Sequence, residues 1–124
     1  MRKSTIVSLA AMAALLVATA AYAAEPPKKT PQLVAKGKAS YEANCASCHG
    51  DTGRGDGAAA VALDPKPRNL VSGAYRNGTK PAEVFATLEK GIEGTTMVPF
   101  GHLPAEERWA LTYYVLDLRK PAKK

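Results

Sequence analysis

Five consecutive residues, Cys45-Ala46-Ser47-Cys48-His49, constrain this chain more than any other feature of its sequence. Two thiols three positions apart at the end of a helix can reach the two vinyl groups on one edge of a porphyrin, and the next histidine then lies under the iron. The C-x-x-C-H spacing therefore predicts one covalently bound haem c per chain. Cys45 and Cys48 would hold the haem, and His49 would bind its iron through Nε2.

The same five residues admit three other interpretations. A thioredoxin-like redox pair would lie beside a βαβ pattern, which the sequence does not show. A disulfide between Cys45 and Cys48 is chemically possible in an oxidising compartment. A zinc site could combine Cys45, Cys48, His49 and His102, but the usual spacing of two histidines is missing, and the adjacent Cys48 and His49 make poor tetrahedral partners. The spacing favours haem attachment over all three.

The N-terminal residues have the pattern of a secretory signal peptide. Arg2 and Lys3 precede an apolar run over residues 6–21, and Ala21-Tyr22-Ala23 places small residues where signal peptidase reads them. We predict cleavage after Ala23 and export to the periplasm. The alternative is an uncleaved membrane anchor, but an apolar run of 16 residues is shorter than the roughly 20 that a membrane-spanning helix needs. After cleavage we expect no stable membrane insertion.

The charge of the chain does not indicate a nucleic-acid partner. The sequence has 17 basic and 11 acidic residues and a formal net charge of +6. Removing the signal peptide takes away two basic residues and leaves a net charge of +4, and two ionised haem propionates would lower it further. No basic stripe interleaved with aromatic residues is visible. We expect protein redox partners, no nucleic acid, and a monomer.

The sequence predicts an all-α fold in a single domain. Apolar periodicity, capping residues and helix-ending Gly and Pro predict helices over about residues 33–45, 81–90 and 104–119, and one or two helical turns over 58–63. Pro81 suits the first helical turn and Gly91 a helix end. No alternating strand pattern is present. We divide the chain into a signal peptide (1–23), a flexible lead-in (24–32), the domain (33–119) and a basic tail (120–124).

Met97 is the candidate for the second axial ligand. It is the one methionine outside the predicted signal peptide, and it lies in an irregular segment punctuated by Gly94 and Pro99. A core methionine usually fills a gap on a regular element, so this position suits a ligand better. Thioether ligation favours reduced iron and raises the potential. His102 is the alternative ligand and would lower the potential, and an open sixth position is a third alternative.

The ring of His49 also needs an acceptor for its second nitrogen, because metal-binding histidines are oriented by such a hydrogen bond. The turn Pro65-Lys66-Pro67 offers backbone carbonyls for this role. Of these, the carbonyl of Pro67 is the predicted acceptor.

Over about residues 34–118 the chain resembles class I cytochromes c, in particular small bacterial periplasmic ones. The residues from Gly37 to Tyr41, followed by the C-x-x-C-H motif and Gly50, resemble the N-terminal helix and haem motif of the family. Residues 107–115 resemble its C-terminal helix, and Gly94-Thr95-Thr96-Met97 resembles its distal-ligand strap. One departure is Val98, which stands between the methionine and a proline that many relatives have directly after it.

The resemblance implies a cytochrome c fold, with three to four short helices wrapped around one haem. It also implies that the first and last helices cross at a small residue, where Gly37 and Tyr41 would meet Leu111 and Tyr114. In this family the function is electron transfer rather than enzymatic catalysis. A rim of charge around the exposed haem edge could include Lys66, Arg68, Arg76, Lys80 and Lys90.

Two other functions are compatible with a haem domain. The chain could be a haem-bearing subunit of a periplasmic dehydrogenase or oxidase, which co-purification with a partner would reveal. It could also be a gas sensor or a peroxidase-like enzyme, which would require an open sixth position. The sequence shows no acid–base pair suited to peroxide chemistry. A diffusible electron carrier is the function that the sequence favours.

Overall fold

The computed structural model describes residues 25–119, and within that range it is all-α, as predicted. Its elements are α1 (Pro31–Asn44), α2 (Ala46–His49), the 3-10 helix η1 (Ala58–Ala62), α3 (Pro81–Lys90) and α4 (Ala105–Leu118). The predicted signal peptide and basic tail lie outside the described residues. No helix within residues 25–119 is long and apolar enough to cross a membrane.

Helix α1 begins at Pro31, two residues before the predicted start. The Thr30 side chain accepts a hydrogen bond from the backbone N–H of Leu33 at 3.1 Å, which caps the helix. Pro31 suits the first helical position because it has no N–H to leave unpaired. Just before the cap, the Tyr113 hydroxyl donates to the carbonyl of Pro27 at 2.6 Å, so the residues preceding α1 contact α4.

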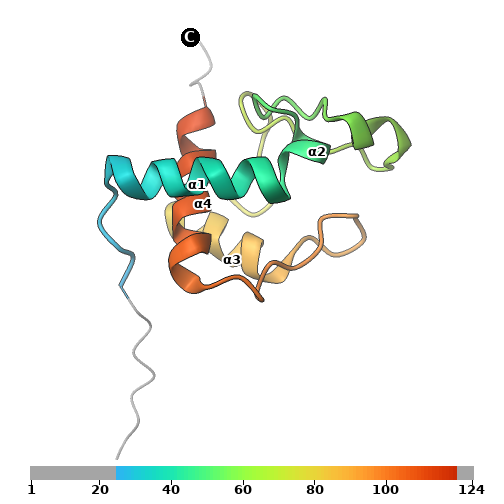
Figure 1. Cartoon of the computed structure of the whole chain (residues 1–124). Coiled ribbons are helices and arrows are strands. Elements are labelled where there is room, and N and C mark those ends of the chain that lie inside the picture. The colour runs from blue at the N-terminus through green and yellow to red at the C-terminus, as the bar shows by residue number, and fades with distance from the viewer. Residues whose placement is uncertain (1–24, 120–124) are drawn as a thin grey trace, which may run out of the picture.

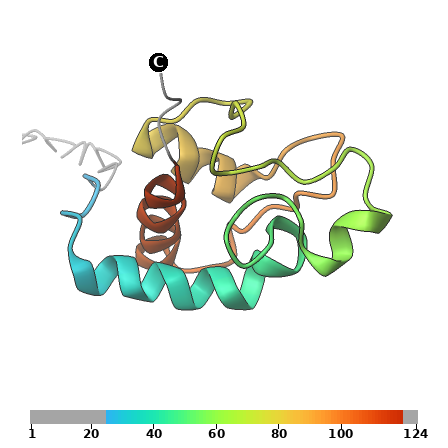
Figure 2. The same ribbon diagram turned by 90° about the horizontal axis from the view of Figure 1, so that it is seen from above.

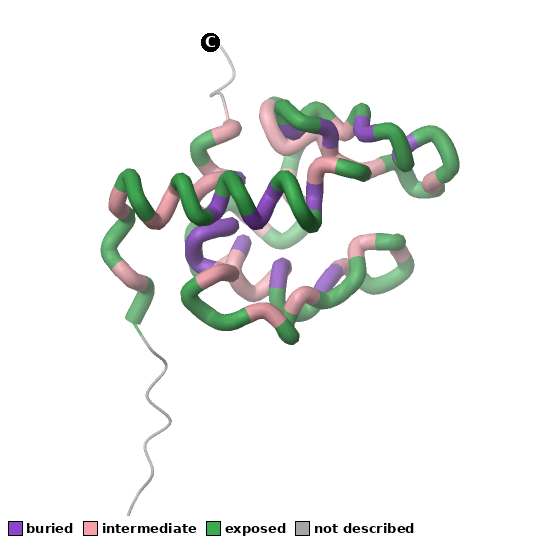
Figure 3. The backbone as a smooth tube through the Cα atoms, in the orientation of Figure 1, coloured by how far each residue is buried: buried purple, intermediate pink, exposed green. Residues whose placement is uncertain are grey.

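Helices α1 and α4 cross (Figures 1 and 3), and the buried residue Gly37 of α1 lies against α4 at this crossing. A Cβ atom at Gly37 would lie 2.0 Å from the carbonyl oxygen of Ala110 and 3.0 Å from the Cβ of Tyr114. The absence of a side chain therefore lets the two backbones approach. One turn further along α1, the ring of Tyr41 packs against that of Tyr114 with 5.2 Å between centroids. This confirms the crossing that the family resemblance implies.

Helix α3 has the predicted ends. The Glu83 carboxylate accepts the N–H of Lys80 at 2.9 Å at the start, and Gly91 ends the helix with φ +68°. Its side chain Phe85 stacks on Trp109 of α4, with ring centroids 4.1 Å apart. Together the helices enclose a core of Tyr41, Cys45, Val84, Leu88, Leu111 and Val115.

A glycine-rich loop joins α2 to η1 and curls back over α2 (Figure 2). The N–H of Gly55 donates to the carbonyl of His49 at 2.7 Å, and the N–H of Gly57 donates to that of Cys48 at 3.1 Å. A Cβ atom at Gly57 would lie 2.2 Å from the carbonyl oxygen of Ser47, so only glycine allows this close approach. The loop therefore holds η1 beside the C-x-x-C-H motif.

Candidate cofactor site

An apolar cavity of about 260 Å³ opens beside α2. Helix α2 and the segment that follows α3 lie on either side of it (Figure 1). Its deepest side chains belong to the core and come from three helices: Tyr41, Val84, Leu88 and Val115. The fold therefore leaves a space in its centre that apolar side chains line but do not fill.

Both cysteines line this cavity. Each has a free thiol, and no disulfide joins them in the structure. The backbone turns once more after α1, since the N–H of Cys45 donates to Tyr41 and that of His49 to Cys45. Burial, with a smaller contribution from Cys48, raises the pKa of the Cys45 thiol to about 11. Cys45 is therefore a protonated thiol at neutral pH, in contact with the cavity.

The ring of His49 also lines the cavity, and its Nδ1 is 3.0 Å from the backbone carbonyl oxygen of Arg68. The predicted acceptor, Pro67, is therefore wrong by one residue. The carbonyl oxygen of Pro67 instead faces Gly55, where it lies 2.6 Å from the position that a Cβ atom would occupy. Burial lowers the pKa of His49, and the hydrogen bond to Arg68 opposes that shift. A neutral ring with its proton on Nδ1 leaves the Nε2 lone pair free to bind a metal.

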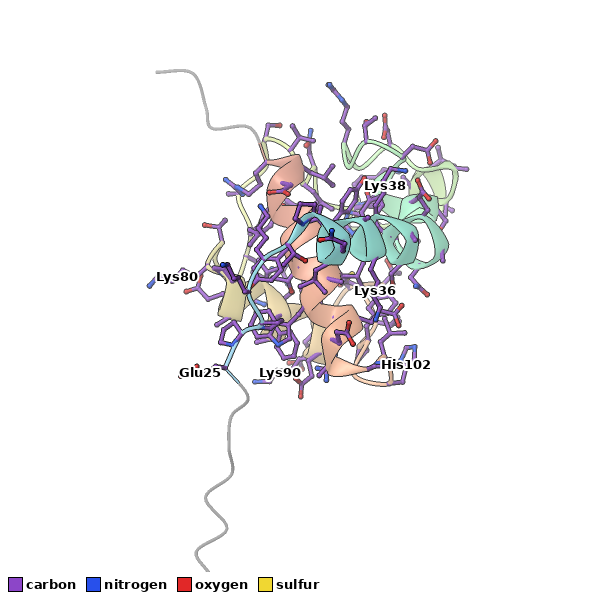
Figure 4. The ribbon with its side chains drawn as sticks, turned by 60° about the vertical axis from the view of Figure 1, so that its left-hand side comes forward. Glu25, Lys36, Lys38, Lys80, Lys90 and His102 are labelled. Atoms are coloured by element: carbon purple, nitrogen blue, oxygen red, sulfur yellow. The ribbon has the colours of Figure 1, made fainter. Side chains whose placement is uncertain are left out.

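The structure distinguishes between the two candidates for the second axial ligand. Met97 lines the cavity and packs against the core. His102 is exposed, and Figure 4 shows it projecting from the surface just before α4. Its ring lies beside that of Phe100, with 5.9 Å between centroids, and it does not line the cavity. Of the two side chains, only Met97 shares a cavity with His49.

The zinc alternative finds no support. Among residues 25–119, no group of three or more His, Cys, Asp or Glu side chains is placed to hold a metal ion. His102 does not line the cavity that Cys45, Cys48 and His49 share. The free thiols likewise give no support to the disulfide alternative.

The charged side chains that line the cavity are all cationic: Lys66, Arg68 and Arg76. Lys66 donates to the carbonyl oxygens of Ala60 and Val61 at the end of η1, at 2.9 and 3.0 Å. The Arg76 guanidinium is 3.5 Å from the carbonyl oxygen of Glu93. No Asp or Glu lines the cavity. The lining therefore suits a large apolar group that carries anionic substituents, and a haem with two propionates fits this description.

One lining residue has no recognisable signal in the sequence. Tyr75 lies in the loop before α3, donates its hydroxyl to the carbonyl of Leu70 at 2.8 Å, and carries the Arg119 guanidinium 4.6 Å above its ring centre. Burial raises the pKa of Tyr75, and Arg119 opposes that shift. Only the folding of this irregular loop against the helices brings Tyr75 to the cavity.

Comparison with known proteins agrees with this site. A family model described as cytochrome C oxidase, cbb3-type, subunit III matches residues 32–115. No curated protein matches the chain. Among solved structures, a chain of the reducing HAO-like protein complex Kustc0457/Kustc0458 of Kuenenia stuttgartiensis is similar, with a TM-score of 0.72 and 34% sequence identity. The similarity covers 77% of this chain and 47% of that one, so the present chain spans about half the length of that relative.

Three findings indicate a cytochrome c. They are the matched family, the helical fold and the cavity beside the C-x-x-C-H motif. The family model covers α1 except Pro31 and α4 as far as Val115, and all the residues that line the cavity, from Tyr41 to Val115, lie within the match. Members of this family carry covalently bound haem and transfer electrons. The chain belongs to the cytochrome c family that this model describes, and it is a small monohaem class I cytochrome c.

Proposed function

We propose that this cytochrome is a periplasmic one-electron carrier whose haem is attached through Cys45 and Cys48 and ligated by His49 and Met97. One observation carries the proposal: His49 and Met97 line the same apolar cavity as both thiols, whereas His102 does not. Haem iron supplies the one-electron change between its ferric and ferrous states. The protein supplies the ligands, an apolar surrounding that keeps water from them, and a fixed geometry.

The roles of the side chains follow from their surroundings. Arg68 holds the His49 ring through its backbone carbonyl, which keeps Nε2 as the ligating nitrogen. Tyr41 donates its hydroxyl to the carbonyl of Gly50 at 2.7 Å and so ties α1 to the residue after His49. Ligation of the iron by both His49 and Met97 would leave no position on the metal for a substrate. The proposed double ligation therefore favours a carrier over an enzyme.

The assignment of Met97 is tested by its replacement with alanine. The ferric wild-type protein is expected to show a weak absorption band near the red end of the visible spectrum, which reports sulfur–iron ligation. Met97→Ala is expected to lose this band and, once reduced, to bind carbon monoxide, because the sixth position is then open. His102→Ala is the control. Like wild type, it is expected to keep the red band in the ferric state and not to bind carbon monoxide once reduced. A red band that persists in Met97→Ala would rule out this ligand.

The cationic lining predicts an effect on the reduction potential. A positive charge near the haem disfavours the ferric state, so Arg76→Gln is expected to lower the midpoint potential. Arg76 is exposed, and solvent screening limits the shift to the order of tens of millivolts. Lys90→Gln removes the same charge from an exposed position outside the cavity lining and is the control (Figure 4). Equal shifts in the two variants, measured by redox titration, would show that Arg76 has no special relation to the haem.

A stable complex is the second candidate function. The matched family description names an oxidase subunit, and the similar structure is a component of a protein complex. The two exposed large hydrophobic residues among those described, Val61 and Val98, are 83% and 56% exposed. Val98 lines the cavity, and Val61 is bonded through its carbonyl to the lining residue Lys66. An apolar rim at this opening fits contact with a protein partner, and co-purification of the native protein distinguishes a subunit from a free carrier.

A further inference from the structure

The hydroxyl of Thr95 makes two hydrogen bonds within the segment that carries Met97. It donates to the carbonyl of Ile92 at 2.7 Å and accepts the N–H of Met97 at 3.0 Å. Two backbone bonds complete the turn: the N–H of Thr95 donates to Ile92, and the N–H of Ile92 donates to the carbonyl of Met97. A single side chain therefore joins the beginning of the turn to the backbone of Met97.

This side chain replaces the regular structure that the segment lacks. Residues 91–104 contain no helix or strand, so neither a helical nor a sheet hydrogen-bonding pattern orients the backbone of Met97. Gly94 has φ +75° and no atom within 4 Å of the position of a Cβ atom, so packing does not hold the tip of the turn. Besides the 3.5 Å contact of Arg76 with the carbonyl oxygen of Glu93, the hydrogen bonds of Thr95 are the side-chain interactions that define this turn.

The other end of the segment rests directly on α3. A Cβ atom at Gly91 would lie 2.5 Å from the carbonyl oxygen of Met97 and 2.8 Å from the nitrogen of Pro99. The backbone from the Met97 carbonyl to Pro99 therefore lies against the end of α3, while the Thr95 hydroxyl bonds the N–H of Met97 from the turn. Between these two supports, the Met97 side chain is presented to the cavity that it lines.

We infer that Thr95 is a positioning residue that holds the Met97 sulfur in place as an iron ligand. The inference rests on the proposed ligation by Met97. The neutral thioether must compete with other ligands for the iron, and a segment free to move would lose that competition more often. The hydroxyl of Thr95 lowers the population of such open states by bonding the backbone of Met97.

The test measures how readily an external ligand displaces the methionine. Imidazole is titrated into the ferric holoprotein, and loss of the red absorption band reports displacement. Thr95→Val keeps the shape of the side chain and removes both hydrogen bonds, and we expect it to bind imidazole about tenfold more tightly than wild type. Thr95→Ser keeps the hydroxyl and is expected to stay within about twofold of wild type.

Thr96 provides the matched control. It is the adjacent residue, it is exposed, and its hydroxyl has no hydrogen bond to any residue between 25 and 119. Thr96 lines the same cavity as Thr95, so Thr96→Val controls for the loss of a hydroxyl from the lining, and its affinity for imidazole is expected to stay within about twofold of wild type. An unchanged affinity in Thr95→Val, or equal increases in both valine variants, would overturn the inference. A Thr95→Ser variant that binds imidazole as tightly as Thr95→Val does would also overturn the inference.

Met97→Ala separates this inference from the proposed function. If that variant keeps the red band, the proposed ligation fails. If it loses the band while Thr95→Val behaves like wild type, the ligation stands and only the role of Thr95 fails. Should Thr95→Val mature poorly, the comparison of Thr95→Ser with wild type and Thr96→Val remains decisive: a marked rise in imidazole affinity despite the retained hydroxyl would contradict the inference.

Discussion

Replacement of both Cys45 and Cys48 with alanine is expected to yield a protein without covalent haem and without a stable fold. The two thiols lie at the same cavity and are the only groups that can form thioether links there. Without haem, the cavity of about 260 Å³ remains. At about 24 cal/mol per Å³, leaving it empty costs at most on the order of 6 kcal/mol. That is comparable to the whole stability of a small domain, about 5–15 kcal/mol.

Intact mass, visible absorption and far-ultraviolet circular dichroism measure this outcome. The double variant is expected to have the mass of the bare polypeptide, no visible colour and reduced helix content. Ser47→Ala is the control, because Ser47 is exposed between the two cysteines and its replacement leaves both thiols intact. This variant is expected to be coloured and to carry haem. A coloured double variant with the mass of a covalent adduct would contradict the assignment of both cysteines.

Gly37→Ala is expected to destabilise the protein by about 3 kcal/mol, although alanine is the better helix former. Helix propensity alone would stabilise α1 by about 1 kcal/mol. The new methyl group, however, would lie 2.0 Å from the carbonyl oxygen of Ala110. That atom belongs to the backbone of α4, so no side-chain rotation relieves the clash and the helices must separate. Overpacking of this kind costs about 1–3 kcal/mol or more, and this clash lies at the severe end.

The sign of the change makes this prediction decisive. Denaturant unfolding of the holoprotein gives the free energy of unfolding for wild type and variant. Ala39→Gly, at an exposed position of the same helix, is the control and is expected to cost about 1 kcal/mol through propensity alone. A Gly37→Ala variant more stable than wild type would show that the two backbones do not meet at this point.

The ends of the helices were predictable because local interactions set them. Pro81 lacks the N–H that the first turn leaves unpaired, and Gly91 adopts the positive φ that ends α3. The start of α1 was predicted two residues late, because Thr30 and Pro31 were assigned to the lead-in rather than to a cap and first turn. The short helix α2 was not predicted as a separate element, since the break at Cys45 has no signal in residue type.

The carbonyl that accepts the hydrogen bond of the His49 ring could not be predicted from local sequence alone. The sequence indicates a carbonyl in the turn after Leu63, but adjacent carbonyls point in different directions. The packing of the loop against Gly55 turns the Pro67 oxygen away and leaves that of Arg68 for the His49 ring. Only the relative placement of two distant loops decides between these neighbours.

The sequence by itself determined the parts of this protein that depend on short spacings. The five residues from Cys45 to His49 lie within one and a half helical turns, so their order alone brings two thiols and an imidazole to one edge. Tertiary structure decided the rest: that Met97 rather than His102 faces the cavity, that three cations gather in its lining, and that Thr95 bonds the backbone of Met97. These relations join segments tens of residues apart or follow the path of an irregular loop. They depend on packing, which no local pattern of residues encodes.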